Sequence, residues 1–116
     1  MPEPYVGITG IHILQDSNGS PNSFSIDYKT ENFTESRDGY HIHFFFNTVK
    51  PENAGKPGTG PWELYYGPSP FTGLKVSSKP GKATQICTLV ANADHTPYYP
   101  ASGQLNTGNC WNIPPY

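Results

Sequence analysis

The strongest strand pattern in this chain is Asp38-Gly39-Tyr40-His41-Ile42-His43-Phe44-Phe45-Phe46-Asn47, a run of aromatic and β-branched residues. Successive side chains of a strand point to opposite faces. One face is therefore expected to enter a core with Tyr40, Ile42, Phe44 and Phe46. The other face is expected to carry His41, His43, Phe45 and Asn47. Two imidazoles side by side on a half-polar face suit a metal or a polar ligand, and they equally suit an ordinary half-solvated sheet.

Short strand patterns separated by turn signals recur along the whole chain. The expected strands cover residues 6–14, 24–28, 40–49, 62–66, 71–77 and 84–91. Residues 15–22 contain an Asn18-Gly19 pair and a proline, which is typical of a hairpin turn. Residues 51–61 are too rich in proline and glycine for a helix or a strand. No helix of useful length is predicted.

These patterns predict one all-β domain over residues 1–116. The expected architecture is an antiparallel β-sandwich with Greek-key-like connections, and a small β-barrel is the alternative. The composition agrees, because aromatic residues make up 14% of the chain. Charged residues also make up 14%, compared with about 25% in a typical domain. Disordered chains have the opposite bias, so a folded, loop-rich domain is favoured.

The charge and hydropathy of the sequence argue against two kinds of partner, nucleic acids and the interior of a membrane. The net charge is −2, and the seven lysines and arginines form no basic block, so no nucleic-acid partner is predicted. No apolar run approaches the ~20 residues needed to cross a bilayer, so no membrane span is predicted. Met1 to Pro4 lacks the charged start and apolar centre of a signal peptide. We therefore expect either a cytoplasmic protein or a mature form whose leader has been removed.

The two cysteines, Cys87 and Cys110, favour the mature, exported form. An even cysteine count in a chain rich in Tyr, Gly, Pro and Asn is typical of an exported domain with a disulfide. Such a domain would have an extracellular or cell-surface location. A bridge would hold down the C-terminal segment and stabilise the fold by about 3 kcal/mol. Two unpaired thiols in a cytosolic protein are the alternative.

The His-x-His pair is the first candidate for chemistry. Imidazoles at positions i and i+2 of a strand can ligate one copper or zinc ion, which then requires a third and usually a fourth ligand. His95 follows the last expected strand, where such ligands gather, and it is adjacent to Asp94. The sequence thus predicts a metal site of His41, His43 and His95, with Asp94 as a further ligand or as a partner of a ligand. The alternative is three exposed or hydrogen-bonded histidines with unrelated roles.

An aromatic surface for a ligand or a partner is the second candidate. Aromatic side chains in or near loops can stack on sugar rings or anchor a protein partner. The residues predicted for this role are Phe45, Trp62, Tyr65 and Trp111. The alternative is that these rings pack inside the domain. The sequence contains no nucleophile elbow, phosphate-binding loop or dinucleotide fingerprint, so catalysis is not favoured.

A local resemblance to a known family accompanies these patterns. Residues 39–43, Gly-Tyr-His-Ile-His, resemble the copper-ligating strand of copper/zinc superoxide dismutases, which are β-sandwiches with a stabilising disulfide. The zinc-binding loop of that family is not matched, since residues 51–61 contain no histidine. The resemblance implies a pair of copper ligands on a sandwich strand, and it does not imply dismutase activity.

A longer resemblance covers residues 38–110. The order His-Ile-His-Phe-Phe-Phe, then Ala-Gly-Lys-Pro-Gly-Thr-Gly-Pro-Trp, then Pro-Phe-Thr-Gly and a closing Gly-Asn-Cys is similar to a group of short exported bacterial proteins. This resemblance implies export and the pairing of Cys87 with Cys110. It implies no particular activity.

Together these observations predict an exported, non-catalytic binding module whose expected ligand is a transition metal, copper or zinc, held by the His-x-His strand. A structural subunit that self-associates in an extracellular filament or surface layer is one alternative. A carbohydrate-binding module is the other. The expected partners are accordingly further copies of the chain, or an extracellular protein or glycan.

Overall fold

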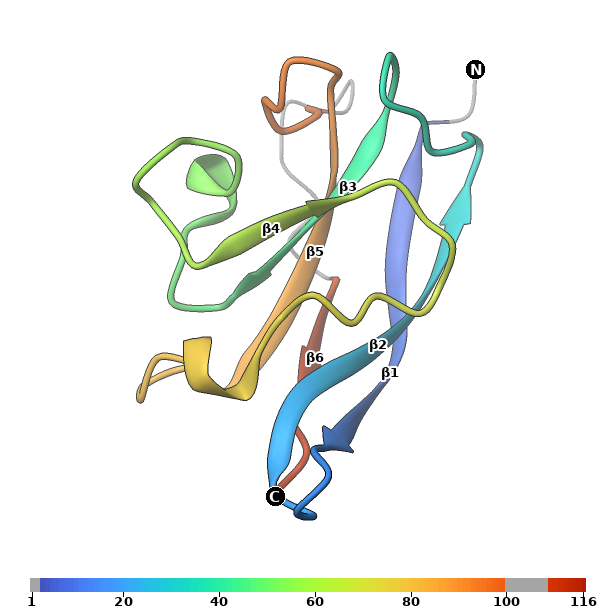
Figure 1. Ribbon diagram of the computed structural model, residues 1–116. Helices are drawn as coiled ribbons and strands as arrows, with labels where there is room; N and C mark the ends of the chain where they lie inside the picture. Colours follow the sequence, from blue (N-terminus) through green and yellow to red (C-terminus); the bar gives the residue numbers. More distant parts are fainter. Residues whose placement is uncertain (1–2, 100–108) are drawn as a thin grey trace.

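The computed structural model of this protein describes residues 3–99 and 109–116 (Figure 1). This part of the chain contains six strands, two short 3-10 turns and no α-helix. The strands are β1 (Tyr5–Gln15), β2 (Pro21–Glu31), β3 (His41–Phe46), β4 (Trp62–Tyr65), β5 (Gln85–Ala91) and β6 (Cys110–Asn112). The 3-10 turns are η1 (Pro51–Asn53) and η2 (Val76–Ser78). Within the same residues, no helix has the length and apolar character that crossing a membrane requires.

β1 and β2 form a long antiparallel hairpin that is a sheet of its own. Its turn lies where the Asn-Gly pair predicts it. The carboxylate of Asp16 accepts hydrogen bonds from the N–H groups of Asn18 (2.8 Å) and Ser20 (3.0 Å). Gly19 has a φ of 79°, a conformation that glycine adopts without steric cost. The predicted hairpin is therefore confirmed.

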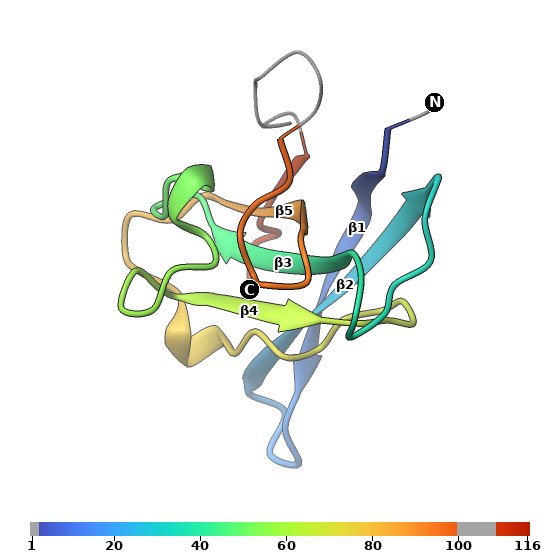
Figure 2. The same ribbon diagram turned by 90° about the horizontal axis from the view of Figure 1, so that it is seen from above.

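The second sheet contains four antiparallel strands in the order β4-β3-β5-β6. β3 lies between β4 and β5, with Ile42 opposite Tyr65 on one side and Val90 on the other. Figures 1 and 2 show the β1–β2 hairpin packed across one face of this sheet. Two separate antiparallel sheets, neither of them closed, confirm the predicted β-sandwich rather than the barrel.

The main core lies between the two sheets and is largely aromatic. β3 contributes Ile42, Phe44 and Phe46, none of which has any exposed area. Phe44 stacks on Phe71 with ring centroids 4.5 Å apart, and it meets Tyr28 of β2 edge-on at 5.3 Å. Burial of each such side chain contributes roughly 1.5–3 kcal/mol. The inward face predicted for this strand is therefore confirmed.

The opposite face of the four-stranded sheet is buried as well. Phe45, Cys87 and Leu89 form a second apolar cluster with Val49 and Ala54 of the loop that follows β3. The alternative of an ordinary half-solvated sheet is therefore wrong for this face, because every residue of β3 is buried. The cover comes from the loop after β3 and from the turn after β5 (Figure 2). These irregular segments have no sequence pattern that places them over the sheet.

The strand expected over residues 71–77 does not form. Phe71 exchanges two backbone hydrogen bonds with Ile26 of β2 (2.8 and 2.9 Å), and the carbonyl of Leu74 accepts one from Phe24 (2.9 Å). The Phe71 ring folds over Gly73, where an added Cβ would lie 2.5 Å from the ring. The segment therefore joins the edge of β2 through isolated bridges and continues into η2.

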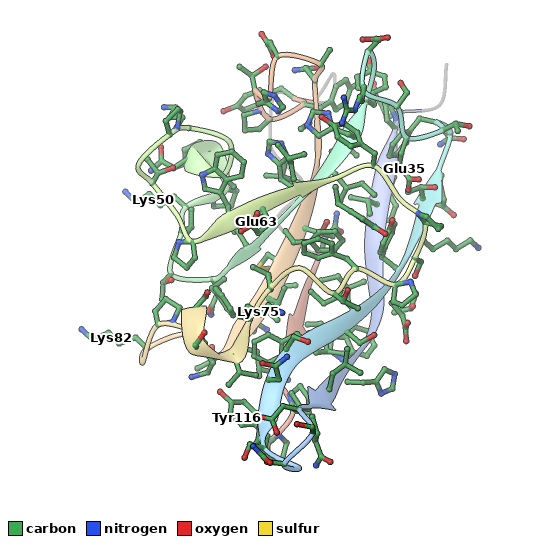
Figure 3. All side chains as sticks on the ribbon, viewed as in Figure 1. Glu35, Lys50, Glu63, Lys75, Lys82 and Tyr116 are labelled. Atoms are coloured by element: carbon green, nitrogen blue, oxygen red, sulfur yellow. A yellow bond between two sulfur atoms is a disulfide. The ribbon has the colours of Figure 1, made fainter. Side chains whose placement is uncertain are left out.

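A disulfide joins Cys87 of β5 to Cys110 of β6, which confirms the predicted pairing. The two residues are direct neighbours across the β5–β6 ladder. The bridge thus reinforces a three-residue strand that the sequence pattern did not predict. At the end of this segment, Tyr116 lies beside the β1–β2 hairpin (Figure 3) and meets the ring of Phe24 edge-on, with centroids 6.1 Å apart.

Candidate metal centre

β3 places His41 and His43 on the face of the four-stranded sheet that points away from the hairpin. In the ladder with β5, His41 lies opposite Ala91 and His43 lies opposite Leu89. Neither imidazole has any exposed area. Because Ala91 carries only a methyl group, a ring from another segment can fill the space beside His41.

His95 supplies that ring from a tight turn after β5. The N–H of Asn92 donates to the carbonyl of Thr96 (2.8 Å), and the N–H of His95 donates to the carbonyl of Asn92 (2.9 Å). His95 has a φ of 72°, which is uncommon for a residue other than glycine. The turn folds back along the end of β5, where Pro97 bridges to Ala91. This fold-back brings the partly buried His95 imidazole to β3.

Three ring nitrogens converge at this point. The Nε2 of His41 is 3.0 Å from the Nε2 of His43 and 3.2 Å from the Nδ1 of His95. The ligand atoms of all three residues lie within 4.8 Å of one another. Nitrogen ligands of tetrahedral zinc, at about 2.0–2.1 Å from the metal, are separated by about 3.3 Å. The structure thus brings together the three histidines that the sequence grouped, at a spacing close to that of a ligand set.

The loop that covers the site fixes the protonation of His43. Its Nδ1 donates a hydrogen bond of 2.9 Å to the carbonyl oxygen of Ala54. Nδ1 therefore carries the hydrogen, and Nε2 presents a lone pair to His41 and His95. Burial lowers the pKa of His43 to about 4, against the opposing effect of the bond to Ala54. The imidazole is therefore neutral at pH 7, which is the form that binds a metal.

One ring nitrogen of His41 is not satisfied. Its Nδ1 is buried and has no partner of hydrogen-bond geometry among the described residues. Burial lowers the pKa of His41, and the nearby backbone of Gly39 opposes this effect. A buried unpaired polar atom costs about 1–3 kcal/mol. With Nε2 bound to a metal, the ring hydrogen would sit on Nδ1.

Gly55 allows the covering loop to lie directly against two of the histidines. Its φ is 143°, in the region that disfavours other residues. An added Cβ would lie 2.2 Å from the carbonyl oxygen of His95 and 3.1 Å from the ring of His43. The loop backbone therefore closes this side of the cluster, and it leaves no room for a side chain.

Two aromatic rings enclose the cluster from the side of β4. Trp62 stacks on His43 with centroids 4.9 Å apart, and Tyr66 lies beside His41 at 5.0 Å. The Nε1 of Trp62 donates a hydrogen bond of 2.9 Å to the carbonyl of Lys56, which fixes the indole orientation. The guanidinium of Arg37 lies 5.8 Å from the centroid of the Tyr66 ring. The imidazoles of His41 and His43 are therefore surrounded by rings and backbone rather than by water.

Asp94 lies outside the group of converging ligand atoms. Its carboxylate is exposed and accepts hydrogen bonds from the hydroxyl (2.5 Å) and the N–H (3.1 Å) of Thr96. These bonds are the main cause of the lowered pKa of Asp94, and the charge of His95 adds slightly to it. In this geometry Asp94 shapes the turn that carries His95.

The residues predicted for an aromatic partner surface lie in different environments. Phe45 is only 2% exposed and belongs to the second apolar cluster. Tyr65 is half-buried, and its hydroxyl donates to the carbonyl of Pro68 (2.8 Å). Trp62 stacks on the histidine cluster, whereas Trp111 of β6 is 42% exposed. The four residues therefore do not form one continuous surface.

The sequence reasoning did not assign Ala54, Gly55 or Tyr66 to the metal site. Tyr66 lies opposite His41 when the observed pairing of Ile42 with Tyr65 is continued by one residue. Correct pairing of these two strands would therefore have found it. Ala54 and Gly55 act through the backbone of an irregular loop, and their side chains carry no signal of this role.

Comparison of the chain with protein-family models, curated proteins and solved structures found no match. The chemistry of the centre therefore rests on its own geometry. Three imidazole nitrogens, two of them in fully buried rings, can bind a metal ion, and the identity of the ion is not fixed by this geometry alone.

Proposed function

We propose that this chain is an exported, non-catalytic module that binds one transition metal ion, copper or zinc, through His41, His43 and His95. The observation that carries the proposal is the convergence of Nε2 of His41, Nε2 of His43 and Nδ1 of His95 within 4.8 Å. Imidazole nitrogen is a preferred ligand of both metals. The contact between His43 and Ala54 orients one of these ligands in the way that metal sites commonly use.

The surroundings of the cluster support binding rather than catalysis. Hydrolysis at a metal centre usually requires a carboxylate or another base beside the metal. Within residues 3–99 and 109–116 the converging ligand atoms all belong to histidines, and Asp94 is held by Thr96 in solvent. The rings of Trp62 and Tyr66 restrict the space available to a substrate.

The disulfide supports the exported location. Structural disulfides form and persist in oxidising compartments and are rare in the cytosol. Cys87 and Cys110 form such a bridge across two neighbouring strands.

The direct test is the metal content of the protein, purified without a histidine tag and measured by mass spectrometry beside a chelator-treated sample. We expect close to one copper or zinc ion per chain after incubation with each metal. The double variant His41→Ala plus His43→Ala and the single variant His95→Ala should each lose it. His12→Ala is the matched control, because His12 is exposed and bonds to Asp27 outside the cluster. Equal metal content in the control and the site variants would contradict the proposal.

A further inference from the structure

The ligand set of the proposed centre carries no negative charge. All three converging groups are imidazoles, and metal-binding imidazoles are neutral. A bound ion would therefore keep its full charge, in contrast to sites that contain thiolate or carboxylate ligands. This inference deepens the proposed function and rests on it.

The charged groups around the cluster do not compensate for that charge. Asp94, the acid adjacent to His95 in the sequence, is exposed to solvent and bonded to Thr96, so water screens its effect. Arg37 lies above the ring of Tyr66, which is next to His41, but it is also exposed, so water screens its positive charge as well. Any ion held by the three histidines would thus lie among rings and backbone, with no acid among the converging ligand atoms of the described residues.

Two of the three ligands are fully buried, so a bound ion loses most of its contact with water at this site. The Born cost of that transfer grows with the square of the charge, so it is about four times larger for a divalent ion than for a monovalent one. We propose that the centre binds copper in its monovalent state in preference to divalent zinc.

The number of ligands in the cluster also favours monovalent copper over zinc. Zinc held by three protein ligands takes a water or a substrate atom as its fourth ligand, which needs space beside the ion. Trp62 and Tyr66 place rings, rather than a fourth nitrogen or carboxylate, beside the three imidazoles. Among the described residues, the converging group contains three ligand atoms and no more.

The inference is tested by competition between the two ions on the wild-type chain. Ascorbate keeps copper monovalent without attacking the disulfide, and oxygen is excluded. Chromophoric chelators specific for each ion report the two dissociation constants. We expect monovalent copper to bind about a hundredfold more tightly than divalent zinc or better. A sample incubated with equal amounts of both ions and then desalted should contain copper.

A pair of variants tests the electrostatic cause. Tyr66→Asp places a carboxylate beside His41, and Tyr66→Asn places a neutral group of the same size there. We expect the aspartate variant, and not the asparagine variant, to shift the preference toward zinc by about tenfold. An equal shift in both variants would overturn the electrostatic explanation. Near-UV circular dichroism of both variants shows whether the packing of the domain survives.

The outcomes separate the two proposals. Tight binding of zinc with weak binding of monovalent copper overturns this inference and leaves the proposed metal-binding function intact. Failure of both ions to bind the wild-type chain overturns both proposals. Copper binding that is equally strong in the double variant His41→Ala plus His43→Ala also overturns both, because the ion would then lie elsewhere.

Discussion

The backbone of Gly55 lies so close to His95 that a Cβ at residue 55 would be 2.2 Å from the carbonyl oxygen of His95. The same added atom would be 3.1 Å from the ring of His43. Because residue 55 has no side chain, the loop that contains it and the turn that carries His95 can lie against each other over β3.

Gly55→Ala should disturb the metal centre more than an ordinary loop substitution does. The new methyl group must push the loop away from His43 and His95, and we expect metal affinity to fall by about tenfold or more. Gly58→Ala is the matched control, because Gly58 also has a positive φ, of 79°, but has open space around its Cα. Both variants should lose about 1–3 kcal/mol of stability from backbone strain. Thermal unfolding and metal titration separate the two effects, and equal affinities would refute the role given to Gly55.

The stability of the metal-free protein should depend on pH through His43. Its pKa is about 4 in the folded state and near its ordinary value of 6.5 in the unfolded state. Between these values the unfolded chain binds a proton that the folded chain does not, so stability falls as the pH decreases from 6.5 to 4. The loss is on the order of 3 kcal/mol. His41 acts in the same direction, because burial lowers its pKa as well.

Denaturant unfolding at several pH values measures this effect. The control is His43→Gln, which lacks the titrating group and should show a shallower decrease over the same range. The exposed carboxylates contribute equally to both proteins and cancel in the comparison. Parallel curves for the two proteins would contradict the prediction.

Trp62 should report occupancy of the centre by its fluorescence. Its indole is stacked on His43 with centroids 4.9 Å apart, so a paramagnetic ion at the cluster would quench its emission. Excess Cu²⁺ serves as the probe, even where its affinity is modest. Trp111→Phe should retain the quenching, and Trp62→Phe should lose most of it, because Trp111 lies on β6 and is exposed. If Trp111→Phe loses the quenching and Trp62→Phe retains it, the ion lies outside the cluster.

Removal of the disulfide should affect stability and metal binding differently. Replacement of Cys87 and Cys110 by alanine should lower the free energy of unfolding by about 3 kcal/mol, because the unfolded chain is no longer constrained. The converging histidines lie on β3 and on the turn after β5, not on β6. We therefore expect the folded variant to keep its metal affinity at low temperature. A large loss of affinity in the folded variant would link β6 to the site.

The fold could be predicted from the sequence where one face of a strand is uniformly apolar. The alternation of residues 40–46 and the Asn18-Gly19 turn indicated a central strand and a hairpin, and both are present. Residues 71–77 also alternate, but Phe71 folds back on Gly73 and ends the pattern. β6 could not be predicted because its three residues are held by the bridge to Cys87 rather than by their own propensity.

The candidate site was predicted only in part, because some of its contacts come from the backbone of a loop. A period of two places His41 and His43 on one face, and the position of His95 after a strand suggests a loop ligand. The burial of that face depends on Ala54 and Gly55, which contact the histidines through the backbone. Backbone contacts between a loop and a strand have no sequence period, so they appear only in three dimensions.

The burial of both faces of β3 has a consequence for the rate of metal exchange. Sheet and core close one side of the imidazoles, and Trp62, Tyr66 and the Gly55 loop close others. Of the three histidines, only His95 is in contact with solvent, and it is carried by the short turn between Asn92 and Thr96. We therefore expect a bound ion to enter and leave on the side of that turn. The lifetime of the complex would then be set by how often two backbone hydrogen bonds open, and not by the strength of the metal–nitrogen bonds alone.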